Sequence, residues 1–347
     1  MSRPRRIAVL LFNLGGPDGQ ADVRPFLYNL FSDRRIIGLP WGVRHLLAGF
    51  ISTTRAKSAR ANYMKMGGGS PLLAETRKQA EALQKRLNRK KGREVRVFVG
   101  MRYWKPFIDD VARDIREWEA DETVVLPLYP QFSSTTTLSG FDVFDRAFDG
   151  PSRKVCCYAA DAAFIDAHAR TVLAWLKLLA PERGAVRILF SAHGLPERII
   201  EAGDPYQEQV EATVARVMAA VGNTLGADMP DHRVCYQSRV GRLVWIGPST
   251  EEALHEAATD GRSVLVVPIA FVSEHIETKV ELDMDYAMLA GDLGILNYAR
   301  APTLGVMPGF IDALAGQVDK ALASDEPVIG DHHCAANHSL CPRRRAA

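Results

Sequence analysis

The sequence predicts an α/β protein built from two doubly wound parallel sheets. Short apolar runs rich in β-branched residues alternate with longer stretches of helical periodicity along most of the chain. These apolar runs are nearly continuous, which is typical of parallel strands whose two faces are both covered by helices. The chain has 347 residues, more than one hydrophobic core usually organises, so we expect two domains.

Seven segments are expected to form strands. They are residues 6–13, 95–101, 123–130, 153–160, 186–193, 233–238 and 263–271. Helical periodicity marks the segments between them, namely residues 71–87, 108–119, 162–179 and 205–221. In PSTEEALHEA, Ser249 and Glu252 have the spacing of a capping box, which predicts a further helix start. This βαβ rhythm predicts open, doubly wound sheets.

A domain boundary is predicted in LLAPERGAV, residues 178–186, where a helix ends in Pro and Gly before the next strand begins. The two expected domains are residues 1–180 and 181–323. Residues 324–347 lose all periodicity, and we expect them to form an irregular extension that contains cysteine and histidine.

Composition and charge exclude several classes of protein. The chain has 43 Lys and Arg against 41 Asp and Glu, so it offers no electrostatic case for binding nucleic acid. No segment approaches 18 uninterrupted apolar residues, and the basic, apolar start lacks a signal-peptide cleavage site. Five cysteines do not suggest a disulfide framework. We expect a cytoplasmic protein, with peripheral contact at an anionic inner membrane through the basic residues 3–6 and 343–345 as an alternative.

Two glycine-rich segments do not support a nucleotide site. NLGGPDG follows the first predicted strand, and MGGGSP lies at residues 66–71. Neither matches the dinucleotide fingerprint or the Walker loop, so a nicotinamide-dependent oxidoreductase is disfavoured. We interpret both segments as tight turns or places where the backbone approaches another group closely.

The predicted strand at 186–193 ends in His193, at the edge of the sheet where α/β proteins bind their ligands. A lone histidine after a strand is most often a hydrogen-bonded loop residue. A second strand, 263–271, runs into the Ser-Glu-His sequence at 273–275 and then into a predicted helix. Because two strand ends share this polar character, we treat His193 as a candidate catalytic residue.

The helix that follows carries Glu277, Glu281 and Asp285, spaced so that all three line one face. Stacked carboxylates repel each other, and a structural helix usually interleaves basic residues. The row is therefore either a solvated acidic face or a carboxylate ladder that passes protons or cations. A neutral imidazole opposite it can accept protons or bind a divalent metal. No HExxH spacing occurs, so no permanent zinc site is expected.

On these residues and their neighbours, the chain resembles the ferrochelatases, enzymes that insert ferrous iron into porphyrin to make haem. The resemblance extends to about Ala323 and depends on a series of segments in a fixed order. They are LFNLGGP with VRPFLYNLFSDRRII, GGGSPL, GMRYWKP, YPQFSSTTT, SAHGLPERIIEAGDPY, YQSRVGRLVWIGPST and PIAFVSEHIETKVELD. It implies two Rossmann-like domains of the chelatase type, with a cleft between them and no nucleotide.

The resemblance also implies roles for these residues. His193 matches the active-site histidine and Glu277 the catalytic glutamate, and both would contact the metal. Glu281 and Asp285 match the acidic relay of the family. His275 is either a partner of Glu277 or an ordinary histidine at a helix start.

A second group of residues matches the porphyrin-binding walls. It consists of Leu14, Arg102, Tyr103 and Trp245, and residues 26–41 match a lip that covers the macrocycle. The implied reaction inserts Fe(II) into protoporphyrin IX, forms protohaem and releases two protons. Coproporphyrin III is the rival substrate. Two further functions compete with this one, a cobalt or nickel chelatase and a non-catalytic haem or porphyrin carrier, and the oligomeric state stays open.

The C-terminal cysteines raise the question of an iron–sulfur cluster. Some ferrochelatases hold a [2Fe–2S] cluster on one internal cysteine and three near the C-terminus. The resemblance offers Cys157, Cys334 and Cys341, but Arg343 stands where certain bacterial members have a further cysteine. A cluster needs four ligands, commonly thiolates, so either another residue substitutes or the tail has lost the site. The substitutes in this chain are Cys156, Cys235, His332, His333 and His338.

Overall fold

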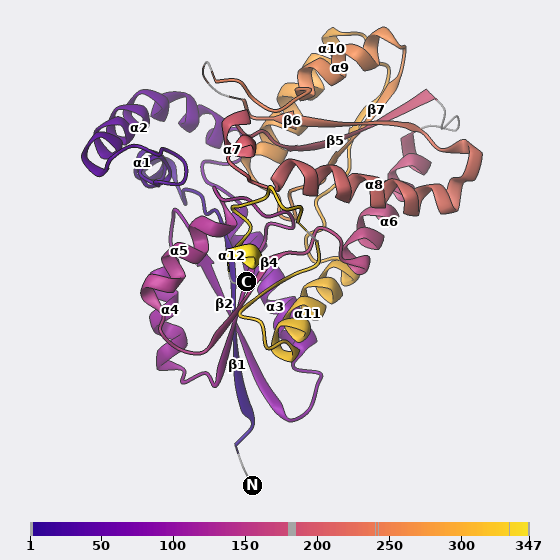
Figure 1. The fold of residues 1–347 in the computed structure, drawn as a ribbon. Coiled ribbons are helices and arrows are strands. Elements are labelled where there is room, and N and C mark those ends of the chain that lie inside the picture. Colours follow the sequence, from indigo (N-terminus) through magenta and orange to yellow (C-terminus); the bar gives the residue numbers. More distant parts are fainter. Residues whose placement is uncertain (1–2, 180–184, 240, 242, 333, 346–347) are drawn as a thin grey trace. The chain divides into compact units, whose positions relative to one another are not determined.

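The computed structural model describes residues 3–179, 185–239, 241, 243–332 and 334–345. By their contacts, these residues form two compact units. The first unit contains residues 3–156 and 314–329, and the second contains residues 157–313 and 330–345. Figure 1 shows both units in one view, and each is described below by itself.

The first unit is built on a five-stranded sheet with the order β2-β1-β3-β4-β9. Strand β1 pairs in parallel with β2 and with β3, and β3 pairs in parallel with β4. The strands are β1 (Arg5–Asn13), β2 (Arg93–Met101), β3 (Glu122–Pro127), β4 (Ser152–Cys157) and β9 (Val328–Gly330). In the central strand, every residue from Ala8 to Phe12 is fully buried, as expected for a parallel strand covered on both faces.

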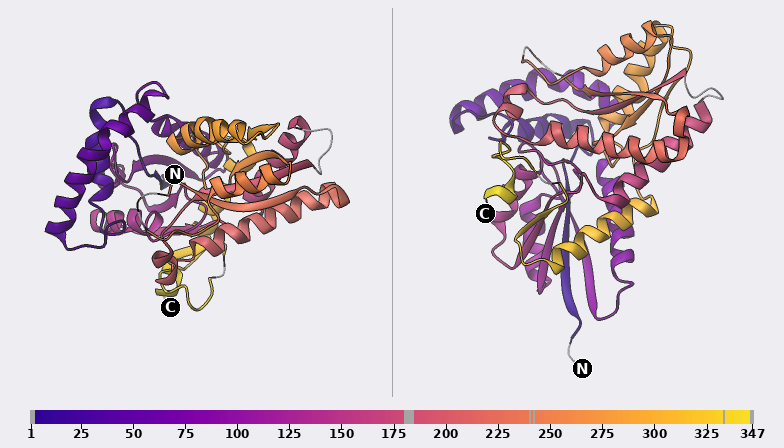
Figure 2. Two further views of the ribbon diagram at one scale, coloured as in Figure 1. Left: turned by 90° about the horizontal axis from the view of Figure 1, so that it is seen from above. Right: turned by 45° about the vertical axis from the view of Figure 1, so that its right-hand side comes forward.

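Helices cover both faces of this first sheet. Figure 1 shows α4 and α5 on one side of the sheet, and α3 with the later part of α11 on the other. Helices α1 and α2 pack against each other as a hairpin, which the left view of Figure 2 shows from above. The helices are α1 (Val23–Phe31), α2 (Trp41–Met64), α3 (Leu72–Leu87), α4 (Ile108–Glu117), α5 (Thr137–Ala147) and α11 (Pro308–Ala323), with a 3₁₀ turn at Gln20–Asp22.

The second unit repeats the arrangement with a four-stranded sheet of order β6-β5-β7-β8, in which every pair is parallel. Its strands are β5 (Val186–His193), β6 (Asp231–Gln237), β7 (Ser263–Pro268) and β8 (Tyr298–Arg300). Helices α6 and α8 lie on one side of the sheet and α9 and α10 on the other (Figure 1). Strand β5 is central and buried throughout except at its last residue, His193.

A wide helix, η4 (Glu277–Asp285), leads directly into α10 in this unit. The remaining helices of the unit are α6 (Ala162–Leu179), α7 (Glu197–Glu201), α8 (Tyr206–Leu225), α9 (Thr250–Thr259), α10 (Tyr286–Asp292) and α12 (Pro342–Arg345), with a 3₁₀ turn at Gly226–Asp228. At the start of α9, Ser249 Oγ accepts from the Glu252 backbone N–H and the Glu252 side chain accepts from the Ser249 N–H. The predicted capping box is therefore confirmed.

The predicted α/β class with parallel sheets is confirmed, and each of the seven predicted strands overlaps an observed one. Strands β8 and β9 and helices α1, α2, α5, α7, α11 and α12 were not predicted. The division by contacts places α6 in the second unit and residues 314–329 in the first. Residues 180–184 lie outside the described part of the chain, so a domain boundary at 180–181 stays a prediction. Among the helices described, none is both long and apolar enough to cross a bilayer.

Candidate active site

The carboxyl end of β5 delivers His193 to the side chain of Glu277. The two residues are 84 positions apart, yet His193 Nδ1 lies 2.8 Å from Glu277 Oε2. About 39% of the His193 side chain is exposed, while Glu277 is nearly buried at 16%. With Nδ1–H donated to the carboxylate, the neutral imidazole keeps the lone pair on Nε2, so this nitrogen can accept a proton or bind a metal.

Strand β7 lies directly beside β5 in this sheet, so the loop that follows β7 brings Glu277 close to the carboxyl end of β5. Ligands of doubly wound sheets bind where the strand order reverses, here between β5 and β7. Glu277 opens η4, whose i→i+5 bonding is seen where Tyr286 N–H donates to Glu281 O. Wide helical turns of this kind are rare and are frequent at functional sites. The predicted helix at this place is thus a π-helix rather than an α-helix.

Glu281 lies beside this pair and is held by β6. Its Oε2 accepts from Ser238 Oγ at 2.6 Å and from Gln237 Nε2 at 3.0 Å. Gln237 is in turn oriented by Ser191 Oγ, which donates to Gln237 Oε1 at 2.7 Å. Ser238 has a φ of 63°, a left-handed conformation that a serine seldom adopts and that often marks functional sites.

The acids and the histidine perturb one another. Burial alone would lower the pKa of His193, but the charge of Glu277, its hydrogen bond and the charge of Glu281 raise this pKa above its usual value. Burial opposes ionisation of Glu277, yet the charge and the hydrogen bond of His193, together with the nearby His275, hold the pKa of Glu277 far below its usual range. Burial and the neighbouring Glu277 charge raise the pKa of Glu281 to about 7. Near neutral pH this end of the sheet therefore holds one permanent anion and two groups that exchange protons.

His275 is more closely connected to the site than its position at a helix start suggests. Its side chain is about 10% exposed, and its Nε2 lies 3.9 Å from Glu277 Oε2. The ring packs on Phe271 with 4.6 Å between ring centroids. Glu277 thus lies between two imidazoles. Asp285 is the last residue of η4, and its place in the acidic relay stays a prediction.

The structure brings three of the predicted porphyrin-binding residues together at the carboxyl ends of β1 and β2, in the first unit. Tyr103 N–H donates to Leu14 O at 2.9 Å. Arg102 Nη2 donates to Asp33 Oδ2 at 2.8 Å, and its Nε donates to Ser139 Oγ at 2.6 Å. Tyr103 Oη also donates to Asp33 Oδ2, at 2.7 Å.

Asp33 is the residue of this group that sequence reasoning missed. Its side chain is 3% exposed, and besides Arg102 and Tyr103 it accepts from Ser139 Oγ and, through Oδ1, from the Arg35 N–H. Burial and the Asp33 charge raise the pKa of Tyr103 well above its usual value, so the phenol stays protonated. Asp33 therefore fixes the direction of Arg102 and ties the predicted lip to β2.

Trp245, the fourth predicted porphyrin contact, belongs to the second unit. A short antiparallel bridge joins it to Pro196, and a Cβ on Gly194 would lie 3.4 Å from its indole ring. The ring therefore covers the backbone that follows His193. Its Nε1–H is buried without a hydrogen-bond partner among the described residues, an unusual state for an indole donor.

The tail brings its cysteines together in the second unit. Burial and the neighbouring Cys341 and Cys157 side chains raise the pKa of Cys334; the largest contribution is its hydrogen bond with Cys341. Gln209 Nε2 donates to Cys334 Sγ at 3.4 Å. Within the described residues, no group of three or more His, Cys, Asp or Glu side chains is arranged to hold a metal ion.

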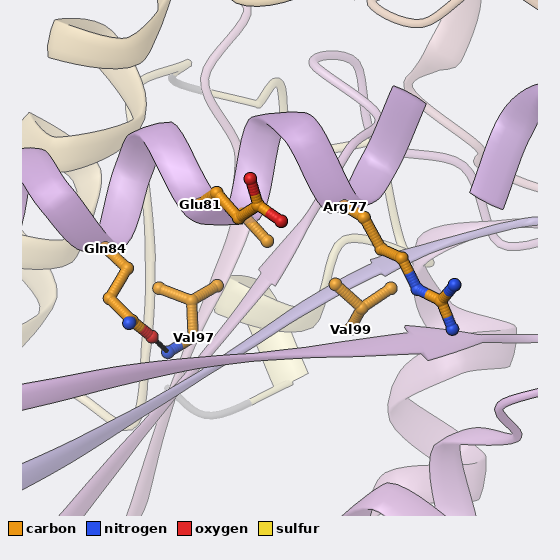
Figure 3. Close-up of a pocket in the computed structure, with 6 residues that line it drawn as sticks. Arg77, Glu81, Gln84, Val97 and Val99 are labelled. Carbon is orange, nitrogen blue, oxygen red and sulfur yellow. Dashed lines mark hydrogen bonds between the residues drawn. The ribbon is translucent and has the colours of Figure 1, made fainter. Parts of the chain in front are cut away.

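A hollow of about 160 Å³ lies in the first unit between α3 and the edge strand β2 (Figure 3). Its lining includes Arg77, Glu81 and Val99, and Gln84 Oε1 accepts from Val97 N–H across it at 2.8 Å. This hydrogen bond satisfies a backbone donor on the edge strand. No predicted site residue lines the hollow, so we assign it no role in the chemistry.

Three comparisons with known proteins bear on this geometry. A family model described as Ferrochelatase matches residues 6–322. A protein of Hyphomonas neptunium named Ferrochelatase is 50% identical over 98% of this chain and 95% of its own length. A Caulobacter vibrioides protein of the same name is 49% identical over 99% of both chains. Among solved structures, SirB from Bacillus subtilis with Fe³⁺ has a TM-score of 0.53 at 12% identity, over 92% of this chain and 96% of its own. That likeness shows the shared fold.

Proposed function

The chain belongs to the ferrochelatase family, and on that premise we propose that it inserts Fe(II) into protoporphyrin IX to form protohaem. The observation that supports this best is the 2.8 Å contact between His193 and Glu277, with Glu281 beside them. The protein is an enzyme whose reaction needs a place to bind the metal and a group to accept protons. An imidazole paired with an acid at a strand end can do both.

The proton balance of the reaction assigns a task to each group. Two pyrrole N–H bonds break as the iron enters, so two protons must leave the ring. His193 Nε2 takes one of them when the imidazole is neutral. Glu281, with a pKa of about 7, takes the other when its carboxylate is ionised and passes it to solvent at the working pH. Glu277 stays anionic, so it attracts Fe(II), a metal that carboxylate and imidazole ligands suit. Its negative charge also stabilises His193 once the imidazole is protonated.

The porphyrin-binding role rests on the first unit. Arg102 uses Nε and Nη2 for Ser139 and Asp33, which leaves the Nη1 hydrogens for a propionate carboxylate. Leu14, which is half-buried, would supply apolar contact beside it, and Tyr103, only 1% exposed, would support this wall from behind. From the second unit, Trp245 would stack on the macrocycle. Fixed walls of this kind bind the ring in one orientation, which lowers the entropic cost of reaching the transition state.

An anaerobic assay with purified protein, Fe(II) and protoporphyrin IX tests the proposal, because free porphyrin and haem absorb differently. We expect turnover with protoporphyrin IX and a lower kcat/KM with coproporphyrin III. A higher kcat/KM with coproporphyrin III would reverse the substrate assignment. Porphyrin binding without any metal insertion would favour a carrier. Preferential insertion of cobalt or nickel would identify a related chelatase.

By residue type, the tail offers to a cluster three thiolates and one imidazole rather than four thiolates, although the described side chains are not arranged as a metal site. Cys156 and Cys157 are adjacent in β4, so their side chains point to opposite faces and only Cys157 joins the tail. Cys235 lies in the core of the second unit, where its thiol donates to Phe190 O. Rieske centres show that imidazoles can replace thiolates. Arg343, which stands where certain bacterial ferrochelatases have a further cysteine, donates to Gly330 O at 2.9 Å.

His338 and His332 both have the surroundings of a metal-ligating imidazole. Their Nε2 atoms lie 3.3 Å and 3.0 Å from the Glu208 carboxylate, and their Nδ1 atoms are buried without a partner in the part of the chain that the structure describes. A ligating histidine usually gives its second N–H to a carboxylate in this way. His333 lies outside the described residues. We propose His338, three residues before Cys341, as the fourth ligand of a [2Fe–2S] cluster.

The visible spectrum and the iron and sulfide content of the protein test this cofactor. We expect the spectrum to weaken or shift in His338→Ala and to remain in His332→Ala. A wild-type protein without iron and sulfide would mean that the tail carries no cluster. Bound [2Fe–2S] would add electron-transfer chemistry, but the proton and metal steps at His193 do not require it.

A peripheral membrane contact is supported by α2, whose outer face carries Val43, Leu46 and Phe50, all exposed and opposite the buried Ala48 and Ser52. An amphipathic surface of this kind inserts at the boundary between headgroups and acyl chains. We expect binding to phosphatidylglycerol vesicles that falls when all three residues are changed to Ser. The matched control is Leu178→Ser, which removes an equally exposed leucine from α6. Equal binding by both variants would show that α2 does not touch the membrane.

A further inference from the structure

Arg300 forms a buried ionic clamp on the helix that carries the two reactive glutamates. Its side chain is 6% exposed and comes from β8, the edge strand of the second sheet. Nε and Nη2 donate to the two carboxylate oxygens of Asp283, and Nη1 donates to Glu274 Oε1, each at 2.7 Å. The guanidinium thus binds one acid in a bidentate manner and a second acid from its other side.

The two acids bound by Arg300 flank the reactive part of η4. Glu274 precedes Glu277 by three residues, and Asp283 follows Glu281 by two. A cation bridging these points restrains both ends of the segment at once. Since η4 is a wide helix, a change of its hydrogen bonding from i→i+5 to i→i+4 would rotate Glu281 relative to Glu277.

Further bonds from the same region hold the clamp in place. Glu274 also accepts from Thr278 Oγ1 at 2.6 Å and from the Thr303 N–H at 3.1 Å. Tyr298, two residues before Arg300 on β8, donates its hydroxyl to Leu282 O at 2.6 Å. Strand β8 therefore contacts η4 through a side-chain clamp and through a backbone carbonyl between Glu281 and Asp283.

We propose that Arg300 is a positioning residue for metal insertion, which keeps η4 wide so that Glu277 and Glu281 both face His193. It touches neither substrate in this role and acts only through η4. The bidentate geometry requires arginine, because a lysine ammonium is a single point charge and cannot bind Asp283 through two parallel hydrogen bonds. The inference rests on the proposed function, and the experiments below separate the two.

The first experiment compares Arg300→Lys with Arg187→Lys. Arg187 is a matched control, since it is 4% exposed and bridges Asp231 and Asp260 at the start of β5, six residues and about 20 Å from His193. For Arg300→Lys we expect kcat to fall about 10-fold to 100-fold, with an unchanged KM for protoporphyrin IX. For Arg187→Lys we expect an unchanged kcat. Equal losses in both variants, or none in Arg300→Lys, would overturn the proposal.

The second experiment measures amide hydrogen exchange of the peptide 274–286. We expect faster exchange in Arg300→Lys than in the wild type or in Arg187→Lys, because η4 loses its restraint. This readout does not depend on turnover. If the exchange difference is present but the wild type inserts no iron, the proposed function is refuted and only a structural clamp is left. Unchanged exchange in an active enzyme would refute the clamp alone.

A third variant separates positioning from simple stability. Arg300→Met combined with Glu274→Gln and Asp283→Asn removes the three charges of the clamp, so that no buried carboxylate is left without its cation, as it would be in Arg300→Met alone. We expect its thermal midpoint to return toward that of the wild type while kcat remains low. Recovery of kcat together with stability would show that Arg300 only stabilises the fold.

Discussion

The two sheets share one strand order but carry different chemistry at their carboxyl ends. In each sheet the second strand lies on one side of the first strand and the third lies on the other, so polar side chains collect at equivalent places. In the first unit, Arg102 and Tyr103 both donate to one buried carboxylate, Asp33, so its charge is balanced and its oxygens have hydrogen-bond donors. In the second unit, His193 faces two carboxylates whose pKa values move in opposite directions.

The two sheet ends are therefore suited to different tasks. A satisfied cluster with one cation and one anion is rigid and suits the recognition of a ligand. A cluster in which a second, buried carboxylate lies beside one that is already ionised is electrostatically strained and suits proton transfer. We therefore propose that the first unit serves mainly in binding and the second mainly in reaction, and the variants below test that division.

The largest effect is expected for Glu277→Gln. This change removes the charge and weakens the hydrogen bond that raise the pKa of His193, so that pKa should fall. We expect kcat to drop about 100-fold or more, because Fe(II) loses its anionic partner. Since His193 must be neutral to take a proton, the acid limb of the pH–rate profile should move to lower pH. A limb that stays in place would mean that His193 does not control it.

A smaller effect, on binding, is expected for Asp33→Asn. The amide cannot accept from Arg102, Tyr103 and Ser139 as a carboxylate does, so Arg102 loses its fixed direction. We expect the Kd for protoporphyrin IX, measured by fluorescence quenching, to rise about 10-fold with little change in kcat. Asp121→Asn, at an exposed pair with Arg3, is the control. A loss in kcat with unchanged Kd would break the proposed division.

The smallest effect is expected for Ser238→Ala. The Ser238 hydroxyl stabilises the charged form of Glu281, whose pKa is about 7. Removing this hydroxyl should therefore raise the pKa of Glu281 above that value. Because an ionised Glu281 removes protons, the rate at pH 7 should fall a few-fold and recover at higher pH. Ser238→Gly lacks the same hydroxyl but accommodates the φ of 63°. Different pH profiles for the two variants would assign the effect to the backbone.

Sequence patterns predicted the elements whose burial leaves a local trace. Continuous apolar runs identified β1 and β5, because central parallel strands are buried on both faces. Strand β8 has only three half-buried residues and left no such run. Helix α2 escaped prediction because its exposed apolar residues blur the helical period. The π-helix could not be predicted, since one shifted hydrogen bond per turn has no signature in a single sequence.

The site was predictable where chemistry follows directly from position along the chain. His193 ends a recognisable strand, and Glu277 follows another. Gln237 and Ser238 also end a predicted strand, in YQSRVGR, and that polar ending was the signal that could have identified them. Asp33 and Arg300 offered no such signal, because each acts through partners far away in the sequence.

The division between binding and reaction is tested most directly by the Kd for protoporphyrin IX and the single-turnover rate of Fe(II) insertion, measured for His193→Ala and Arg102→Ala beside the wild type. We expect a crossed result. His193→Ala should bind porphyrin normally and insert iron at least about 100-fold more slowly, whereas Arg102→Ala should bind more weakly and insert iron at a near-normal rate once saturated. A His193→Ala protein that still inserts iron at a near-normal rate would contradict the central claim.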